Sequence, residues 1–276
     1  VEVMSMVPIG ASIKDGFEAG HGLPFDSDGM KERYPGIFFS QFTGAELMAE
    51  KWNLSREDLD KFALSSHQKA AAAVEGNYFD REILPVQAKN AEGKTDMVLN
   101  DEGIRYDASL EALSGLNPVT EGGVITAGNA SQITDGAAAL MICNDEGLKK
   151  VKADPRARIV GISVVGDDPI LMLGGPIPAS HRVLKETNLK IDDIDLYEVN
   201  EAFAPVPLSW AIELKADMAK LNVNGGAMAL GHPLGATGAK LMTTLLHELE
   251  RTNGKYGLQA ICEGGGTANA TIIERI

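Results

Sequence analysis

In the C-terminal half of the chain, segments with the hydrophobic spacing of strands alternate with segments that have the spacing of helices. Short apolar runs with the composition of strands occur at 158–165, 195–199, 221–223, 257–263 and 270–275. Helix-like segments lie between them at 176–188, 201–215 and 241–251. This β-α-β-α-β-α-β-β order predicts an α/β fold with a mixed sheet covered by helices, in which the last two strands form a hairpin.

The N-terminal half shows helix signals first and weak strand signals later. Thr43 and Glu46 have the spacing of a capping box before a helix that ends near residue 52. Ser55 caps a second helix, which Gly76 ends. The remaining predicted pieces are short strands at 83–86, 95–99 and 103–106 and a helical turn at 109–113.

The pattern changes again at residue 124. We predict a strand at 124–126, a turn at 127–131 and a buried apolar run at 135–143. The polar segment 149–155 is the best boundary before the alternating half. The chain therefore divides into residues 1–123, 124–153 and 154–276.

Composition excludes several classes of protein. The 276 residues are 44% hydrophobic and 23% charged, and the formal net charge of −14 argues against a nucleic-acid partner. Two cysteines, Cys143 and Cys262, form no disulfide framework, which indicates a reducing, cytoplasmic compartment. No apolar run is long enough for a transmembrane helix, and we expect no membrane association. Because the chain begins with Val1, we expect the natural N-terminus to be missing.

Three side chains that could take part in catalysis lie in loops that follow predicted strands. Asn200 follows 195–199, His232 lies in the glycine-rich turn 224–240, and Cys262 ends 257–263. Ligand sites of α/β sheets collect at the carboxyl ends of strands, so these side chains are expected to share a pocket. Each also has a structural reading: Cys262 as a core thiol, Asn200 as a helix cap, His232 as a turn residue. The turn matches neither a P-loop nor a Rossmann fingerprint.

The motifs around these residues resemble those of thiolases, the acyl-CoA:acetyl-CoA C-acyltransferases. The C-terminal motifs are Asn-Glu-Ala-Phe-Ala at 200–204, Gly-His-Pro-Leu-Gly-Ala-Thr-Gly at 231–238 and Cys-Glu-Gly-Gly-Gly at 262–266. Residues 124–138 resemble the central motif, and residues 1–8 resemble the segment that opens the inserted loop domain of the family. The resemblance implies a thiolase-like fold with a loop domain (1–123), a strand–helix piece of the N-terminal domain (124–153) and a C-terminal domain (154–276).

The resemblance also implies the site residues. The catalytic residues would be His232, Cys262, Asn200 and Gly264. The residues that bind CoA or the substrate would be Ser131, Phe203, Ala202 and Met6. No metal and no tightly bound cofactor are expected, because CoA and acyl-CoA are substrates. The acylated cysteine of the family would precede Val1, so this chain alone is expected to be inactive.

The implied reaction is cleavage of a 3-ketoacyl-CoA by CoA, or the reverse Claisen condensation. His232 would accept the proton of the nucleophilic thiol. Cys262 would exchange the α-proton of acetyl-CoA, since an ordinary thiol pKa of roughly 8.5 suits that role. His232 with a water held by Asn200 would bind the enolate oxygen, and the Gly264 N–H with that of the nucleophile would bind the tetrahedral intermediate.

Two alternative functions remain open at this stage. A non-catalytic thiolase-like protein would bind acyl-CoA or lipid with the same fold. A β-ketoacyl synthase-type condensing enzyme would have two active-site histidines and no acid–base cysteine. The resemblance implies a homodimer or homotetramer and is compatible with a β-oxidation partner enzyme. The other histidines match no motif and are interpreted as surface or packing residues: His21, His67, His181 and His247.

Overall fold

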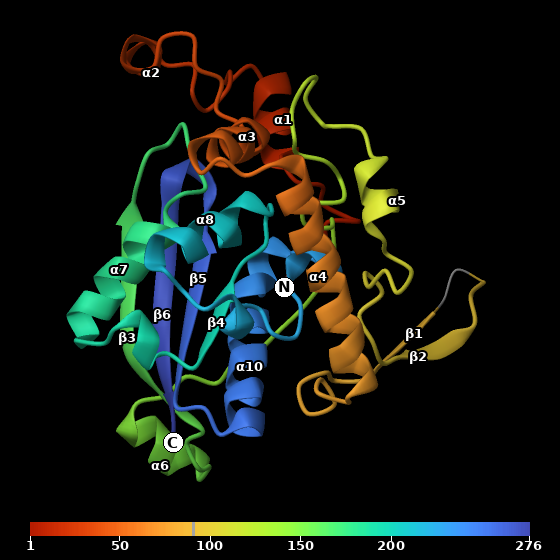
Figure 1. Ribbon diagram of the computed structural model, residues 1–276, viewed down its shortest axis with the longest axis vertical. Helices are drawn as coiled ribbons and strands as arrows, with labels where there is room; N and C mark the ends of the chain where they lie inside the picture. Colours follow the sequence, from red (N-terminus) through yellow and green to blue (C-terminus); the bar gives the residue numbers. More distant parts are fainter. Residues whose placement is uncertain (90–91) are drawn as a thin grey trace.

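A four-stranded mixed sheet forms the centre of the C-terminal half (Figure 1). The computed structural model describes residues 1–89 and 92–276. The strands lie in the order β3 (Ala157–Gly166), β6 (Thr267–Arg275), β5 (Tyr256–Cys262) and β4 (Leu196–Val199). β4 and β5 are parallel and the other neighbours are antiparallel, which confirms the mixed sheet and the terminal hairpin.

Helices cover both faces of this sheet. Neighbouring residues of a strand point to opposite faces, so Ile272 and Ile273 of β6 contact different helices. Ile272 packs in a cluster with α7 (Pro176–Thr187) and α8 (Pro205–Leu214), whereas Ile273 packs with α10 (Leu234–Thr252). β6 is thus covered on both sides, whereas the edge strand β3 is largely exposed, with Ile162 56% and Val164 62% accessible.

Three predictions in this half are wrong: the starts of two helices and one short strand. α8 begins at Pro205 instead of residue 201, because the ring of Pro205 is suited to the first helical turn and residues 202–204 pair with another segment. Residues 221–223 form no strand: only a single bridge joins Leu221 to Tyr197. The glycine-rich turn contains a one-turn helix, α9 (Ala227–Leu230), and α10 begins within the turn at Leu234, seven residues before the predicted start at residue 241.

In Figure 1 the helices α1, α2 and α3 lie above the sheet and α4 and α5 beside it, whereas α6 lies below it. Ser40 caps α3 through the Phe42 N–H, so the predicted cap at Thr43 is wrong. Ser55 caps α4 as predicted, and together with Asp58 it forms a capping box. The elements of this half are α1 (Ala11–Glu18), α2 (Asp28–Arg33), α3 (Gln41–Lys51), α4 (Arg56–Glu75), β1 (Val86–Lys89), β2 (Thr95–Val98), α5 (Leu110–Ser114) and α6 (Asp145–Val151).

The connecting segment between the halves differs most from the sequence expectation. Residues 124–126 form one bridge, between Thr126 and Pro118, and no strand. The apolar run 135–143 is exposed: Met141 is 76% and Ile142 is 73% accessible. Among the described residues this run makes a single bridge, from Gly136 to Glu2, and no helix covers it. Residues 103–106 are likewise a turn and not a strand.

Candidate active site

Asn200 and His232 meet beyond the end of β4. Asn200 follows the last residue of β4, and its N–H continues the parallel ladder by donating to the Ala260 carbonyl at 3.0 Å. The distance from Asn200 Nδ2 to His232 Nε2 is 3.2 Å. The other amide atom, Asn200 Oδ1, is buried and has no hydrogen-bond partner among the residues described. An open acceptor beside an imidazole is suited to hold a water or a substrate donor.

Thr237 fixes the tautomer of His232. The Thr237 hydroxyl donates its single proton to the Pro233 carbonyl at 2.9 Å. It must therefore accept the hydrogen bond that joins it to His232 Nδ1, at 2.6 Å. Nδ1 then carries the proton, and Nε2 presents a lone pair that accepts from the Asn200 amide. Thr237 was not among the predicted site residues, although its hydroxyl stands five residues after the histidine in the sequence.

The backbone around His232 is held on both sides. Gly231 has φ of 79°, and a Cβ there would meet the Thr134 side chain. The His232 N–H donates to the Gln132 carbonyl at 3.3 Å, while the Gln132 side chain donates to the Met228 carbonyl at 2.6 Å. Segment 130–134 therefore supports the turn that carries the ring.

Burial keeps His232 neutral. Desolvation, together with the smaller effect of the Lys240 charge, lowers the pKa of its ring from 6.5 to about 4. Nε2 is thus unprotonated over the neutral pH range. A group that takes a proton from a thiol must be unprotonated in this way.

We expect this shift to appear as acid lability. Because the folded pKa of His232 lies below the unfolded one, its contribution to stability is complete above about pH 6.5 and is lost as the pH falls through about 4. The loss amounts to at most roughly 3 kcal/mol. Urea unfolding of the parent and of His232→Gln at about pH 7.5 and about pH 4.5 measures it.

The parent is expected to lose more stability than His232→Gln over that range. Glu82, whose pKa burial raises to about 7, contributes in the opposite direction, because its stabilisation is lost as the pH rises. That contribution is common to both proteins and cancels in the comparison. Equal losses in the two proteins would contradict the buried neutral imidazole.

Cys262 ends β5, the strand next to β4. The residue is 7% accessible and packs in the hydrophobic cluster that also contains Ala202 and Phe203. Within residues 1–89 and 92–276, no hydrogen bond joins it to Asn200 or His232. Burial raises the pKa of the thiol to about 12. The expectation of an ordinary thiol pKa is therefore wrong: Cys262 is a protonated donor at neutral pH.

The glycine run after Cys262 forms a tight turn between β5 and β6. A Cβ at Gly264 would have no heavy atom within 4 Å, so this position is open to an approaching group. Gly265 and Gly266 have φ of 74° and 81°, and a Cβ at Gly266 would lie 2.9 Å from the carbonyl oxygens of Asp167 and Asp168. Glycine therefore has a different reason at each position: residues 265 and 266 have a positive φ, and residue 264 leaves open space for an approaching group.

Segments 129–131 and 202–204 lie side by side next to the Asn200 turn. The Ser131 N–H donates to the Ala202 carbonyl at 2.9 Å, and Ala130 pairs with Phe203. Phe203 is buried and packs edge-on against Phe42, with ring centroids 5.5 Å apart. The structure therefore brings Ser131, Ala202 and Phe203 together with Asn200, whereas Met6 is 79% accessible. Binding roles for these four residues stay predictions.

Other candidate features lie elsewhere. His67 accepts from the Arg105 N–H at 3.1 Å, and His247 lies 3.6 Å from Glu82.

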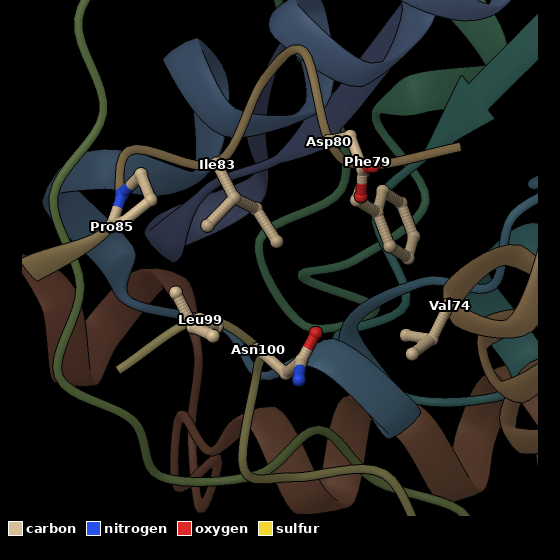
Figure 2. Close-up of a pocket in the computed structure, with 7 residues that line it drawn as sticks. All are labelled: Val74, Phe79, Asp80, Ile83, Pro85, Leu99 and Asn100. Atoms are coloured by element: carbon tan, nitrogen blue, oxygen red, sulfur yellow. The ribbon is translucent and has the colours of Figure 1, made fainter. Parts of the chain in front are cut away.

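A hollow of about 310 Å³ lies between the end of α4 and the β1–β2 hairpin. Phe79, Ile83 and Leu99 line it, and no predicted site residue does (Figure 2). No group of three metal-ligating side chains and no membrane-length apolar helix occurs in the described parts of the chain.

Two family models match consecutive parts of the chain. The thiolase N-terminal domain matches residues 1–146, and the thiolase C-terminal domain matches residues 153–275. A steroid 3-ketoacyl-CoA thiolase of Mycobacterium tuberculosis is 51% identical over 277 residues, which cover 100% of this chain and 67% of that protein. The mitochondrial 3-ketoacyl-CoA thiolase of Bos taurus is 47% identical over 83% of this chain and 58% of its own length.

Solved structures give the same picture. Human mitochondrial 3-ketoacyl-CoA thiolase in complex with CoA superimposes with a TM-score of 0.79 at 44% identity, over 85% of this chain and 58% of that chain. The Bacillus anthracis acetyl-CoA acetyltransferase gives a TM-score of 0.83 at 41% identity, over 88% and 61%. The chain thus spans about three fifths of the length of most of these relatives.

Proposed function

Because this chain belongs to the thiolase family, we propose that it provides the acid–base part of a thiolase active site. The overall reaction would be the cleavage of a 3-ketoacyl-CoA by CoA, or its reverse condensation. The observation that carries the proposal is the Asn200–His232 contact at 3.2 Å, with the imidazole kept neutral and its Nε2 lone pair directed to the amide. The matched relatives are named 3-ketoacyl-CoA thiolases and acetyl-CoA acetyltransferases.

The residues then have separate tasks. His232 Nε2 accepts the proton of the nucleophilic thiol as that thiol attacks and, once protonated, donates to the developing oxyanion. The open Oδ1 of Asn200 holds a water beside it. Cys262, protonated at neutral pH, gives its proton to the leaving acetyl-CoA carbanion. The N–H of Gly264 stabilises the tetrahedral intermediate, in a position that no side chain blocks.

The acylated thiol would come from outside residues 1–276. Cys143 is exposed just before α6, and Cys262 is needed as the acid, so neither cysteine is suited to be the nucleophile.

CoA and acyl-CoA would be substrates and not resident cofactors. We also propose cytoplasmic location and assembly as a homodimer or homotetramer, since the resemblance to thiolases implies both quaternary states.

The experiment compares two proteins in one assay. The 276-residue chain and the full-length protein are incubated with acetoacetyl-CoA or a bulkier 3-ketoacyl-CoA plus CoA, and the acetyl-CoA produced is measured by chromatography. We expect turnover by the full-length protein and none by the 276-residue chain. Turnover by the chain alone would show that the nucleophile lies within it.

The same assay separates the rival functions. CoA binding by the full-length protein without turnover would favour a non-catalytic acyl-CoA binder. Decarboxylation of malonyl-CoA without thiolysis would favour a β-ketoacyl synthase-type enzyme. That second function needs another active-site histidine, and His67 is instead engaged with the Arg105 backbone.

A further inference from the structure

The one-turn helix α9 leads directly into His232, and charged side chains contact both of its ends. At the N-terminal end, Glu201 Oε2 accepts the Met228 N–H at 3.1 Å. At the C-terminal end, Lys240 Nζ donates to the Leu230 carbonyl at 2.6 Å. Each charge has the sign that its backbone partner favours, negative at an N–H and positive at a carbonyl. The chemistry described above uses neither residue.

Glu201 is 1% accessible and joins three segments of the chain. Besides Met228, its carboxylate accepts from Ser66 Oγ on α4 at 2.7 Å and from Asn222 Nδ2 at 2.9 Å. Ser66 Oγ in turn accepts the Gly226 N–H at 3.0 Å, just before α9. A Cβ at Gly226 would collide with the Glu201 carboxylate, so the glycine allows this close approach.

Lys240 lies on α10 and is partly buried. Burial lowers the pKa of its ammonium group, and the carboxylates of Asp101, Glu82, Glu198 and Glu201 oppose that change. Its hydrogen bond to Leu230 holds the last carbonyl of α9. Gly231, which has a positive φ of 79°, comes next in the chain, and His232 follows it. Loss of the bond would leave a carbonyl unpaired where the ring direction is set.

We propose that Glu201 and Lys240 are positioning residues, which hold α9 at its two ends and thereby fix the ring of His232 against Asn200. The inference rests on the proposed function, because it is for thiolysis that the ring must be held. Glu201 also follows Asn200 directly in the chain, so one carboxylate places both members of the contact.

The test uses the full-length protein with Glu201→Gln, Lys240→Met and Lys240→Arg. Lys185→Met, which changes an exposed lysine on α7, is the matched control. We expect kcat of Glu201→Gln and Lys240→Met to fall about 10- to 100-fold while KM for CoA stays within about threefold. Lys240→Arg keeps a charged donor and is expected to recover most of the activity.

Hydrogen–deuterium exchange of the peptides that cover residues 222–234 provides a readout independent of turnover. In Glu201→Gln and Lys240→Met these amides are expected to exchange faster, while β5 and β6 stay as protected as in the control. Unchanged exchange and unchanged kcat in folded variants would overturn the proposal. So would an equal loss in Lys240→Arg and Lys240→Met.

Failure of the proposed function gives a different result. If the parent shows no turnover but both substitutions make the α9 amides exchange faster, thiolysis is refuted and the positioning role is supported. If Lys240→Met does not fold, Glu201→Gln, which preserves the shape of the side chain, decides between the outcomes: a parent-like kcat overturns the proposal, and a selective loss of kcat supports it.

Discussion

Replacement of Cys262 by alanine in the full-length protein is expected to abolish the exchange of deuterium into the methyl group of acetyl-CoA. Cys262 is a thiol at the carboxyl end of β5, and burial raises its pKa to about 12. The protonated form donates to the carbanion and becomes a thiolate, and in the reverse direction that thiolate, a strong base at this pKa, removes the α-proton of acetyl-CoA. Loss of such an acid–base group should lower the exchange rate by up to about 10⁴-fold.

The same variant should still form the acyl-enzyme. Acylation by acetyl-CoA releases a CoA thiol and no carbanion, so it needs His232 but not the proton of Cys262, and intact mass after quenching should show one acetyl group on the protein. Cys143→Ala, which removes an exposed thiol, is the matched control and should behave as the parent. Exchange at the parent rate in Cys262→Ala would exclude Cys262 as the base, and loss of acylation together with exchange would contradict the separate roles.

The sheet of this protein was predictable because strand signals are local. The runs that became β3, β5 and β6 alternate or are fully apolar, and their turn residues mark their ends. Pro205 also gave a local signal, which the prediction of a helix from residue 201 overlooked. The run 135–143 could not be placed in this way, since apolar composition does not say which surface covers it, and the residues described here leave it exposed.

Part of the candidate site followed from topology. Parallel strands end at one edge of a sheet, so residues just after β4 and at the end of β5 had to lie near one another. The partners that set the chemistry did not follow. Thr237, which fixes the tautomer of His232, and Lys240, which holds the Leu230 carbonyl, act through contacts made only after folding.

Glu201 shows the same limit more sharply. In sequence it stands at the start of a predicted helix, where a carboxylate has an ordinary place. In the structure it precedes α8 and is buried among donors from three other segments. The pKa of Cys262 is a further case: the residue type predicts an ordinary thiol, and only its burial raises the value to about 12.

Replacement of His232 by asparagine is expected to stop the reaction earlier than loss of Cys262 does. The ring holds its Nδ1 proton on Thr237 and offers its Nε2 lone pair, so it is the group able to take the proton of the nucleophilic thiol. Asparagine cannot accept that proton as a base. We therefore expect both acylation and α-proton exchange to fall, acylation by about 10³- to 10⁴-fold, because a base and an oxyanion donor are lost together.

The measurement is the rate of acyl-enzyme formation, followed by rapid quench and intact mass at several pH values. His181→Asn on α7 changes an exposed histidine and serves as the control. If His232 is the base, a pH high enough to ionise the nucleophile should partly restore acylation in His232→Asn, because a thiolate no longer needs a proton acceptor. Acylation of His232→Asn at the parent rate near neutral pH would show that another group activates the thiol. Without restoration at high pH, the main task of His232 would be to stabilise the oxyanion.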